Sequence, residues 1–279
     1  MRHSDERFGD VLGVGELSIG RRLGTGGQGV VYELVGRLQG FVYKQYRRFR
    51  SFVELADLVR FPSGLPGRTQ TWLCERTAWP VAVVANDGHA CGVVMPAASS
   101  RFYGPTAAGP RLRELQYLLY PPKPFWADMQ LLGPAGRIAV ARQMAMLVSC
   151  LHAHGLLVGD MSMMNVLWSP APTRILLLDC DGIRPSSLAA TRTLIHTIDW
   201  DDPIPSTGLD SDNYKLALLV GRVLAQSATV RPGQDLRLLP GLPFEMAVDV
   251  SVTFAEAAGP AGTRPDAARW LQALPIEPR

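Results

Sequence analysis

Two short apolar runs, each bordered by polar side chains, constrain the fold of this chain more than any other feature. Residues 166–168 and 175–178 flank a turn that contains two prolines, which predicts a pair of short strands. Asp160 and Asn165 precede the first run, and Asp179 directly follows the second. A carboxylate can orient a hydroxyl group and accept its proton, and oxygen ligands can hold Mg²⁺ against phosphates. The three residues therefore predict phosphoryl transfer from a nucleotide.

A glycine-rich segment near the start of the chain points to the same chemistry. It lies between residues 17–23 and 30–34, both of which have the apolar, β-branched pattern of strands. The glycines therefore predict a hairpin, whereas a dinucleotide-binding glycine motif would open a helix. A hairpin can cover the phosphates of a nucleotide, and a glycine-rich surface turn is the alternative interpretation. The residues that we expect to contact the nucleotide here are Gly24, Thr25, Gly26, Gly27, Gln28, Gly29 and Val31.

Lysine is rare in this chain. The 28 basic residues include only three lysines, Lys44, Lys123 and Lys215. Lys44 lies in the strand-like run 41–46 that follows the glycine-rich segment. From a strand beneath a glycine hairpin, its ammonium group can reach the α- and β-phosphates of a nucleotide. A solvated lysine on an edge strand is the alternative interpretation.

Composition and charge argue against several other classes of protein. The net charge of +3 over 279 residues is small and the arginines are scattered, so no nucleic-acid partner is expected. No apolar stretch approaches the ~18 residues of a membrane helix, so no membrane partner is expected either. The four cysteines show no close pairing, and His152 and His154 would point in different directions, which argues against a disulfide framework and a zinc site. The expected location is the cytoplasm.

The order of the predicted elements indicates an α+β fold in two parts after an extension formed by residues 1–16. Residues 17–96 contain three strands up to residue 46, a helix at 48–60, and strands at 79–84 and 90–95 around a turn at 86–88. This order predicts a small antiparallel sheet with one helix. Residues 97–279 are mainly helical, with a helical piece near 112–119 and a long helix from 134 to about 152 that Gly155 ends. We expect the junction at about residues 95–100.

From about residue 17 to the C-terminus the chain resembles a protein kinase. The resemblance implies a bilobal fold, with residues 17–96 as the N-lobe and residues 97–279 as the C-lobe. In the N-lobe it implies that Gly24, Gly26 and Gly29 form the glycine-rich loop and that Val31 lies over the base. It also implies that Val42 and Lys44 belong to the Ala-x-Lys strand and that Met95 is the gatekeeper residue.

In the C-lobe the resemblance assigns the catalytic residues. Asp160 and Asn165 match the Asp and Asn of the catalytic loop, and Asp179 matches the metal-binding Asp. Leu167 matches the leucine beneath the adenine, and Asp212 resembles the buried Asp of the helix that anchors the catalytic loop. The cofactors that the resemblance implies are ATP and Mg²⁺.

Four short segments look most like one bacterial group of such kinases. Members of this group are often encoded beside von Willebrand-type proteins and metal-dependent protein phosphatases. The segments are residues 79–80, 94–96, 159–160 and 179–181.

The catalytic loop departs from the protein-kinase pattern. Residues 158–159 replace the His-Arg pair before Asp160, so no arginine is present there to receive a phosphate on the activation segment. Ser162 stands where serine/threonine kinases carry a lysine that touches the γ-phosphate, which implies slow turnover. We therefore expect that phosphorylation is not the main on-switch at the nearby threonines, Thr191, Thr193 and Thr197.

Two acidic residues keep alternative roles. Asp181 follows Asp179 by two residues, and it either binds a second metal ion or caps residues 182–183, of which we favour the cap. Glu54 is the expected acidic partner of Lys44 from the following helix, and a solvated glutamate on the helix face is the alternative.

Residues 198–202 form a further acidic cluster that superficially resembles the metal motif of aminoglycoside and choline kinases. They lie too far along the chain from Asn165 for a strand-turn-strand hairpin. We interpret them as part of the activation segment, with Asp201 or Asp202 paired with Arg264, which resembles the arginine of the Arg-Pro segment near the end of a kinase C-lobe. An exposed acidic loop is the alternative.

Together these residues predict an ATP- and Mg²⁺-dependent kinase that transfers the γ-phosphate to a Ser/Thr hydroxyl of a protein. We expect Lys44 and the glycine hairpin to position the triphosphate, Asn165 and Asp179 to hold Mg²⁺, and Asp160 to orient the attacking hydroxyl. The alternatives are a small-molecule kinase of the aminoglycoside-phosphotransferase type and a weakly active pseudokinase scaffold. The sequence leaves the protein substrate and the oligomeric state open.

Overall fold

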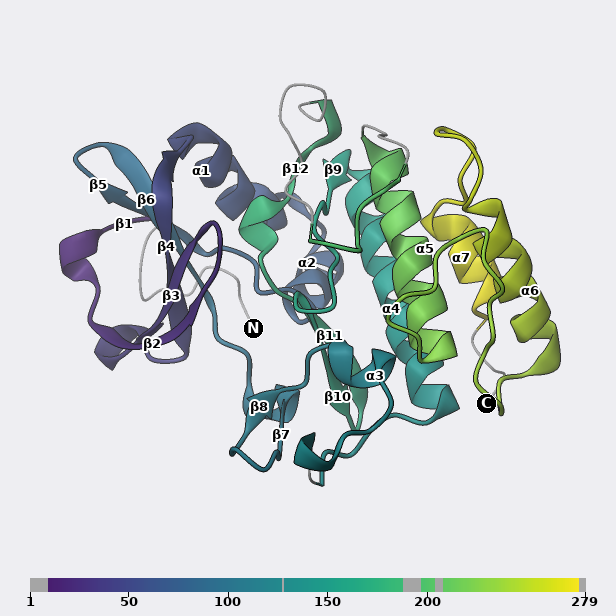
Figure 1. The fold of residues 1–279 in the computed structure, drawn as a ribbon. Helices are drawn as coiled ribbons and strands as arrows, with labels where there is room; N and C mark the ends of the chain where they lie inside the picture. The colour runs from purple at the N-terminus through teal and green to yellow at the C-terminus, as the bar shows by residue number, and fades with distance from the viewer. Residues whose placement is uncertain (1–9, 127, 188–196, 204–207, 276–279) are drawn as a thin grey trace. The chain divides into compact units, whose positions relative to one another are not determined.

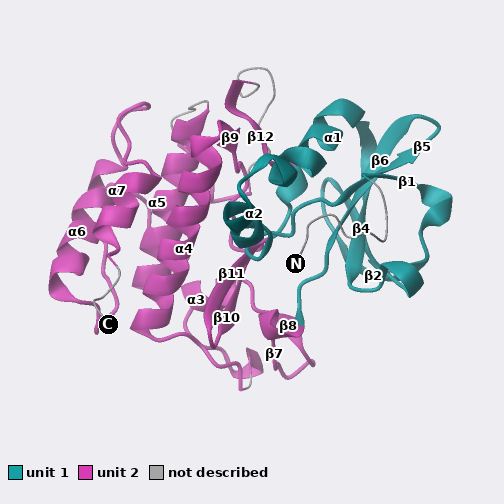
Figure 2. Ribbon diagram, turned by 180° about the vertical axis from the view of Figure 1, so that it is seen from behind, with its two compact units in different colours: residues 1–99, 178–181 teal, residues 100–177, 182–279 magenta. Residues whose placement is uncertain are grey.

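The computed structural model describes residues 10–126, 128–187, 197–203 and 208–275. Over these residues the protein mixes helices and strands, with seven α-helices, one six-stranded sheet and three two-stranded sheets (Figure 1). The chain divides into two compact units, Met1–Ser99 with Leu178–Asp181, and Ser100–Leu177 with Gly182–Arg279 (Figure 2). The boundary after Ser99 lies within the expected junction, but the short segment Leu178–Asp181 falls in the first unit.

The first unit is built on the six-stranded sheet, in the order β1-β5-β6-β4-β3-β2. Neighbouring strands are antiparallel, except that β1 runs parallel to β5. The expectation of a purely antiparallel sheet with residues 1–16 outside it is therefore wrong. Leu12 is buried in an apolar cluster of the sheet, and the residues around it form the edge strand β1. The strands are β1 (Val11–Gly13), β2 (Ile19–Thr25), β3 (Gly29–Leu34), β4 (Phe41–Arg50), β5 (Ala82–Asn86) and β6 (His89–Pro96).

Apolar side chains cover both faces of this sheet. Successive residues of a strand point to opposite faces, and β4 shows this directly: Tyr43 belongs to one apolar cluster and Tyr46 to the other. The cluster around Tyr46 also contains buried residues of helix α1 (Phe52–Arg60). Lys44 lies between Val42 and Tyr46 in the alternation, so it projects from the face that packs against α1.

Two helices accompany the sheet, where one was expected. Strand β4 continues to Arg50, so α1 begins at Phe52 and not at residue 48. Ser51 caps α1, because its Oγ accepts a hydrogen bond of 3.4 Å from the backbone nitrogen of Glu54. The second helix, α2 (Gly67–Cys74), buries only Leu73. It lacks the apolar stripe on which a sequence-based helix prediction depends.

The second unit is mainly helical. Helix α4 (Pro134–Ala153) packs against α5 (Leu209–Ala225) and α7 (Ala267–Ala273), and α6 (Phe244–Glu256) packs against α5 and α7. Residues 211–224 of α5 are all buried, so α5 is the central helix of this unit. Gly155 adopts a φ of 68° just after α4, as predicted for a residue that ends a helix.

Three short strand pairs complete the second unit. The predicted pair on either side of the proline turn is confirmed, with β10 (Val166–Pro170) antiparallel to β11 (Thr173–Leu177). Strand β9 (Leu156–Leu157) pairs with β12 (Arg184–Pro185), and β7 (Tyr103–Gly104) pairs with β8 (Arg111–Leu112). Because β8 includes Leu112, the helix expected near 112–119 is reduced to α3 (Gln116–Leu119).

No helix within the described ranges has both the length and the apolar character needed to cross a lipid bilayer.

Candidate active site

The glycine-rich segment forms the predicted hairpin. Strands β2 and β3 pair with Thr25 opposite Val30 and Gly24 opposite Val31, and the backbone nitrogen of Gly26 donates to the carbonyl of Gly29 at 2.9 Å. A Cβ atom on Gly29 would lie 2.1 Å from the backbone oxygen of Gln45, so only glycine fits where the hairpin meets β4. A Cβ atom on Gly24, Gly26 or Gly27 would meet no atom within 4 Å, so the tip of the hairpin is open.

Four of the predicted nucleotide-contacting residues share one face of the sheet. Val31 is paired with Lys44 across β3 and β4, and Val42 is paired with Met95 across β4 and β6. Residues directly opposite in an antiparallel pair project to the same side, and so do residues two apart in one strand. The fold of the first unit therefore places Val31, Val42 and Met95 around the stem of Lys44.

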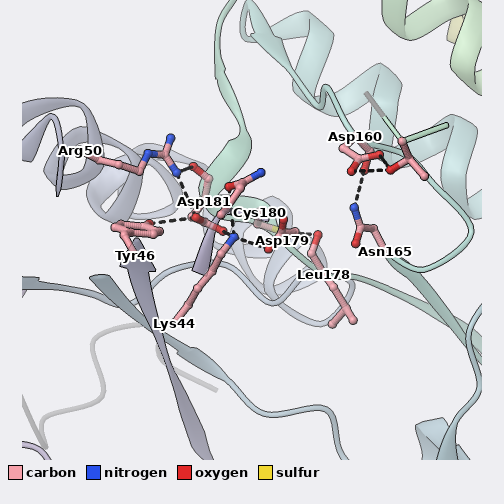
Figure 3. Close-up of polar contacts among 11 residues, drawn as sticks. Lys44, Tyr46, Arg50, Asp160, Asn165, Leu178, Asp179, Cys180 and Asp181 are labelled. Atoms are coloured by element: carbon pink, nitrogen blue, oxygen red, sulfur yellow. Dashed lines mark hydrogen bonds and ion pairs between the residues drawn. The ribbon is translucent and has the colours of Figure 1, made fainter. Parts of the chain in front are cut away.

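Lys44 is almost completely buried, with 4% of its surface exposed. Its Nζ atom donates to Asp181 Oδ1 at 2.9 Å and to Gln28 Oε1 of the glycine hairpin at 3.4 Å, and it forms a short ion pair with Asp179 (Figure 3). Glu54 is not among its partners, so the expected Lys44–Glu54 pair is wrong. Burial disfavours the ammonium form of Lys44, but the carboxylates of Asp181 and Asp179 outweigh it and raise its pKa.

Asp181 is fully buried and accepts hydrogen bonds from three side chains of β4. In addition to Lys44, Tyr46 donates its hydroxyl at 2.9 Å and Arg50 donates Nη1 at 3.0 Å, both to Oδ2 (Figure 3). Arg50 also donates to the backbone oxygen of Asp181 at 3.0 Å. The expected cap of residues 182–183 is therefore wrong, and cationic donors occupy the carboxylate that a second metal ion would need. Burial and the nearby Asp181 raise the pKa of Tyr46.

Asp179 has an unusual backbone conformation for a residue other than glycine. Its φ is 58°, in the left-handed region that Asp tolerates better than most residues. Such conformations concentrate at sites where a side chain must be aimed in one direction. Here it brings the carboxylate of Asp179, which is 32% exposed, to the ammonium of Lys44. Asp179 and Lys44, 135 residues apart in sequence, are thus brought together as predicted.

In the second unit the loop before Asp160 is fixed by helix α5. Asp212 accepts hydrogen bonds from the backbone nitrogens of Val158 at 2.6 Å and Gly159 at 2.9 Å, which confirms its predicted role as an anchor of the loop. Lys215 donates from Nζ to the carbonyl oxygen of Gly159 at 2.5 Å. Burial lowers the pKa of Lys215, and the nearby carboxylates of Asp212 and Asp160 oppose that shift.

Asp160 and Asn165 are adjacent within this loop. Asn165 donates from Nδ2 to the backbone oxygen of Asp160 at 3.2 Å (Figure 3). The hydroxyl of Thr197 lies 3.1 Å from both carboxylate oxygens of Asp160, so this carboxylate accepts a hydrogen bond from a hydroxyl group of the protein itself. Thr191 and Thr193, the other two threonines considered above, lie outside the described residues.

Leu167, the residue expected beneath the adenine, lies in β10 opposite Leu176 and is fully buried. It belongs to the second unit together with Asp160 and Asn165, whereas Lys44 and Asp179 belong to the first. Among the described residues no three His, Cys, Asp or Glu side chains form a metal-binding group. The expected Mg²⁺ ligands, Asn165 and Asp179, remain a prediction.

Arg264 forms the predicted ion pair, and its partner is Asp202. The pair is bidentate, with Nη1 at 2.5 Å and Nη2 at 2.9 Å from the two carboxylate oxygens, and Nη1 also lies 3.1 Å from Asp210. Both side chains of the Arg264–Asp202 pair are almost fully buried. Asp201 instead faces Arg231 at 3.8 Å.

Three residues of these clusters were not anticipated. Tyr46 follows Lys44 by two positions, a spacing that places both on one face of a strand, and this signal was present in the sequence. Lys215 follows Asp212 by three positions on a helix, which also places the two side chains on one face. Arg50 gives no such signal, because the sequence around it fits a helix as well as the end of β4.

No protein-family model matches this chain, and a search of curated proteins finds no match to it.

Proposed function

We propose that this protein is an ATP- and Mg²⁺-dependent kinase of the protein-kinase fold that transfers the γ-phosphate to a Ser/Thr hydroxyl of a protein. One observation carries the proposal: Lys44 is buried on the sheet face beside the glycine hairpin, and its ammonium group meets the carboxylate of Asp179. A buried lysine needs a reason to be in an apolar sheet, because burial of a charge is costly unless the charge is paired. A role for Lys44 in binding a triphosphate, beside a residue that holds the metal ion, would explain why a lysine is buried there.

The residues around Lys44 suit the parts of ATP. Lys44 and the open backbone of Gly24, Gly26 and Gly27 would position the phosphates, since backbone amides and an ammonium group favour anions. The apolar side chains of Val31, Val42 and Met95 would contact the base, with Leu167 added by the resemblance alone. Thr25, Gln28 and Gly29 complete the hairpin, and Gln28 also contacts Lys44.

The chemistry of two side chains fits Mg²⁺. Asp179 offers a partly exposed carboxylate, and Asn165 uses the nitrogen end of its amide to bind Asp160, which leaves the oxygen end for a cation. When bound, Mg²⁺ supplies positive charge that offsets the charge developing on the transferred phosphoryl group. Asp179 would exchange its contact with Lys44 for the metal.

Asp160 would orient the attacking hydroxyl. The substrate oxygen forms a bond to the γ-phosphorus, the bond from that phosphorus to the β,γ-bridging oxygen breaks, and the hydroxyl proton passes to the Asp160 carboxylate. The contact with Thr197 supports this role, because a hydroxyl group already donates to that carboxylate.

A small-molecule kinase is the second candidate. Ser162 is buried where protein kinases carry a catalytic-loop lysine, and aminoglycoside phosphotransferases lack that lysine as well. The buried Arg264–Asp202 pair and the Asp212 anchor resemble protein-kinase features and favour the first candidate. A pseudokinase scaffold is least supported, since Lys44, Asp160, Asn165 and Asp179 all retain groups able to perform their roles.

The test is transfer of label from γ-labelled ATP in the presence of Mg²⁺ and a bacterial lysate. We expect label on protein, and its loss on chelation of Mg²⁺. D160A and D179A should each lower transfer by ~10²-fold or more, while D235A, at an exposed aspartate, should leave it unchanged. Thermal unfolding would verify that all variants fold. Label on small molecules would select the second candidate, and undiminished transfer by D160A or D179A would refute the assignments.

A further inference from the structure

The more deeply buried of the two carboxylates that bind Lys44 is on the same short segment as the predicted metal ligand. Asp181 meets Lys44 at 2.9 Å and is 0% exposed, whereas Asp179 is 32% exposed. Both carboxylates belong to Leu178–Asp181, which groups with the first unit although it lies far along the chain. The lysine is therefore tied to this segment by two ion pairs.

Both carboxylate oxygens of Asp181 are hydrogen-bonded in the observed orientation. A buried carboxylate must be paired and hydrogen-bonded, and removal of a partner from such a group is costly. Lys44 binds Oδ1, while Tyr46 and Arg50 bind Oδ2. All three donors come from β4, so a single strand fixes both the direction of the carboxylate and the lysine that it contacts.

The polar contacts of Lys44 are with Asp179, Asp181 and Gln28, and none of them is with helix α1. Glu54 lies in the first turn of α1, where an acidic residue favours the helix dipole, and its backbone nitrogen donates to Ser51. The buried residues of α1 are Leu55, Ala56, Leu58 and Val59. The helix thus contributes apolar packing to the sheet.

We propose that Asp181 is the positioning residue for Lys44, so that the segment carrying Asp179 itself orients the phosphate-binding lysine and helix α1 does not. This inference rests on the proposed kinase function. Its consequence is that Lys44 and Asp179 are aligned together, because movement of Leu178–Asp181 displaces both. A change in the position of α1 would not by itself remove the partner of Lys44.

The test compares D181N with E54Q, which removes the charge at the position first expected to pair with Lys44. A nucleotide acyl phosphate transfers its acyl group to a lysine held near the phosphates, and the three lysines of the chain are easily separated by peptide mass. In the wild-type protein we expect acylation at Lys44, with exposed Lys123 as the internal reference. D181N should lower acylation of Lys44 and lower kcat by about 10²-fold, with a smaller change in KM for ATP, because the lysine is misplaced and not removed. E54Q should match the wild type in all three measurements.

The positioning role would be overturned, while the kinase function stands, if Lys44 were acylated in D181N to the same extent as in the wild type. It would also be overturned if E54Q lost as much Lys44 acylation as D181N. Absence of both acylation at Lys44 and phosphoryl transfer in the wild type would overturn the kinase function and this inference with it. Acylation of Lys44 that falls only in D181N, together with kcat, would establish both.

A milder variant covers the case in which D181N does not fold. Y46F removes one hydroxyl group from Asp181 Oδ2 and keeps the buried ring, and it should lower Lys44 acylation and kcat by about threefold or more. Wild-type values for folded Y46F would count against the proposal. K44M combined with D181N adds a structural check: the double variant should lower the unfolding midpoint by less than the sum of the single variants, and strict additivity would show that the two side chains are not coupled.

Discussion

The two polar clusters of this protein are stabilised in different ways. Around Lys44, ion pairs join charged side chains of β4 to the carboxylates of Leu178–Asp181. Around Asp160 a buried carboxylate and a buried lysine of α5 bind the backbone, and the Asp160 side chain itself takes no part in that anchoring. Side chains that bind one another can exchange partners when a ligand binds, whereas a backbone bound from a helix keeps its shape. Substitutions in the first cluster should therefore affect chemistry most, and substitutions of the residues that anchor the Asp160 loop should affect stability most.

The largest loss of stability is expected from D212A, which removes the anchor of the Asp160 loop. It leaves the amides of Val158 and Gly159 without their acceptor and deprives Lys215 of a nearby negative charge. The free energy of unfolding should fall by about 3–5 kcal/mol. Urea denaturation would measure it, with D249A on the exposed side of α6 as a control that should change by less than about 0.5 kcal/mol. A loss below about 1 kcal/mol in D212A would mean that the loop is held by other contacts.

The same contrast explains what the sequence could predict. Local patterns were sufficient for the glycine hairpin and for the strand pair before Asp179, whereas the buried helix that carries Asp212 was implied by the kinase resemblance. In the hairpin and the strand pair the signal and the structure lie within a few residues of each other. The edge strand β1 was missed because its pairing with β5 joins distant segments and its length is only three residues.

The partners of Asp181 could not be predicted for a related reason. They depend on where β4 ends, and the arginine-rich end of β4 fits a helix as well as a strand when only the sequence is known. Once β4 extends to Arg50, three of its side chains can converge on one carboxylate more than 130 residues away. Sequence patterns report only proximity along the chain, so they favour a local acid, Glu54, as the partner of Lys44.

A second buried charge pair in the helical unit allows the comparison to be sharpened. R264L would leave Asp202 buried without its bidentate partner and should lower the free energy of unfolding by about 3 kcal/mol. The double variant R264L/D202L should recover part of this loss, because the buried charge of Asp202 is then removed as well, although Asp210 still loses its contact with Arg264. Thermal or urea unfolding would measure both. Equal losses in the single and the double variant would show that packing, and not the unpaired charge, sets the cost.

Two glycines of the hairpin separate stability from chemistry within the first unit. G29A would place a Cβ atom 2.1 Å from the backbone of Gln45 and should cost about 1–3 kcal/mol, because β3 and β4 must move apart. G27A adds a methyl group in open space and should change stability by less than about 0.5 kcal/mol. If G27A nevertheless raises KM for ATP, the open backbone contacts the nucleotide. Equal stability of G29A and the wild type would show that the hairpin can shift without cost.

The smallest expected effect concerns the pH dependence that Tyr46 adds to the Lys44 cluster. Burial and the neighbouring Asp181 raise the pKa of Tyr46 in the folded protein above its ordinary value of about 10. The unfolded chain therefore loses this proton first, so the stabilisation is complete below pH ~10 and is lost as the pH rises above it, at about 1.4 kcal/mol per pH unit. Y46F should cost only about 1 kcal/mol at neutral pH, since Lys44 and Arg50 still bind Asp181. Urea denaturation from pH 8 to 11 should then show the stabilities of Y46F and the wild type converging above pH ~10. Curves that stay parallel over this range would mean that the phenol ionises freely in the folded protein, and that the side chains around Asp181 are less tightly held than the backbone around Asp160.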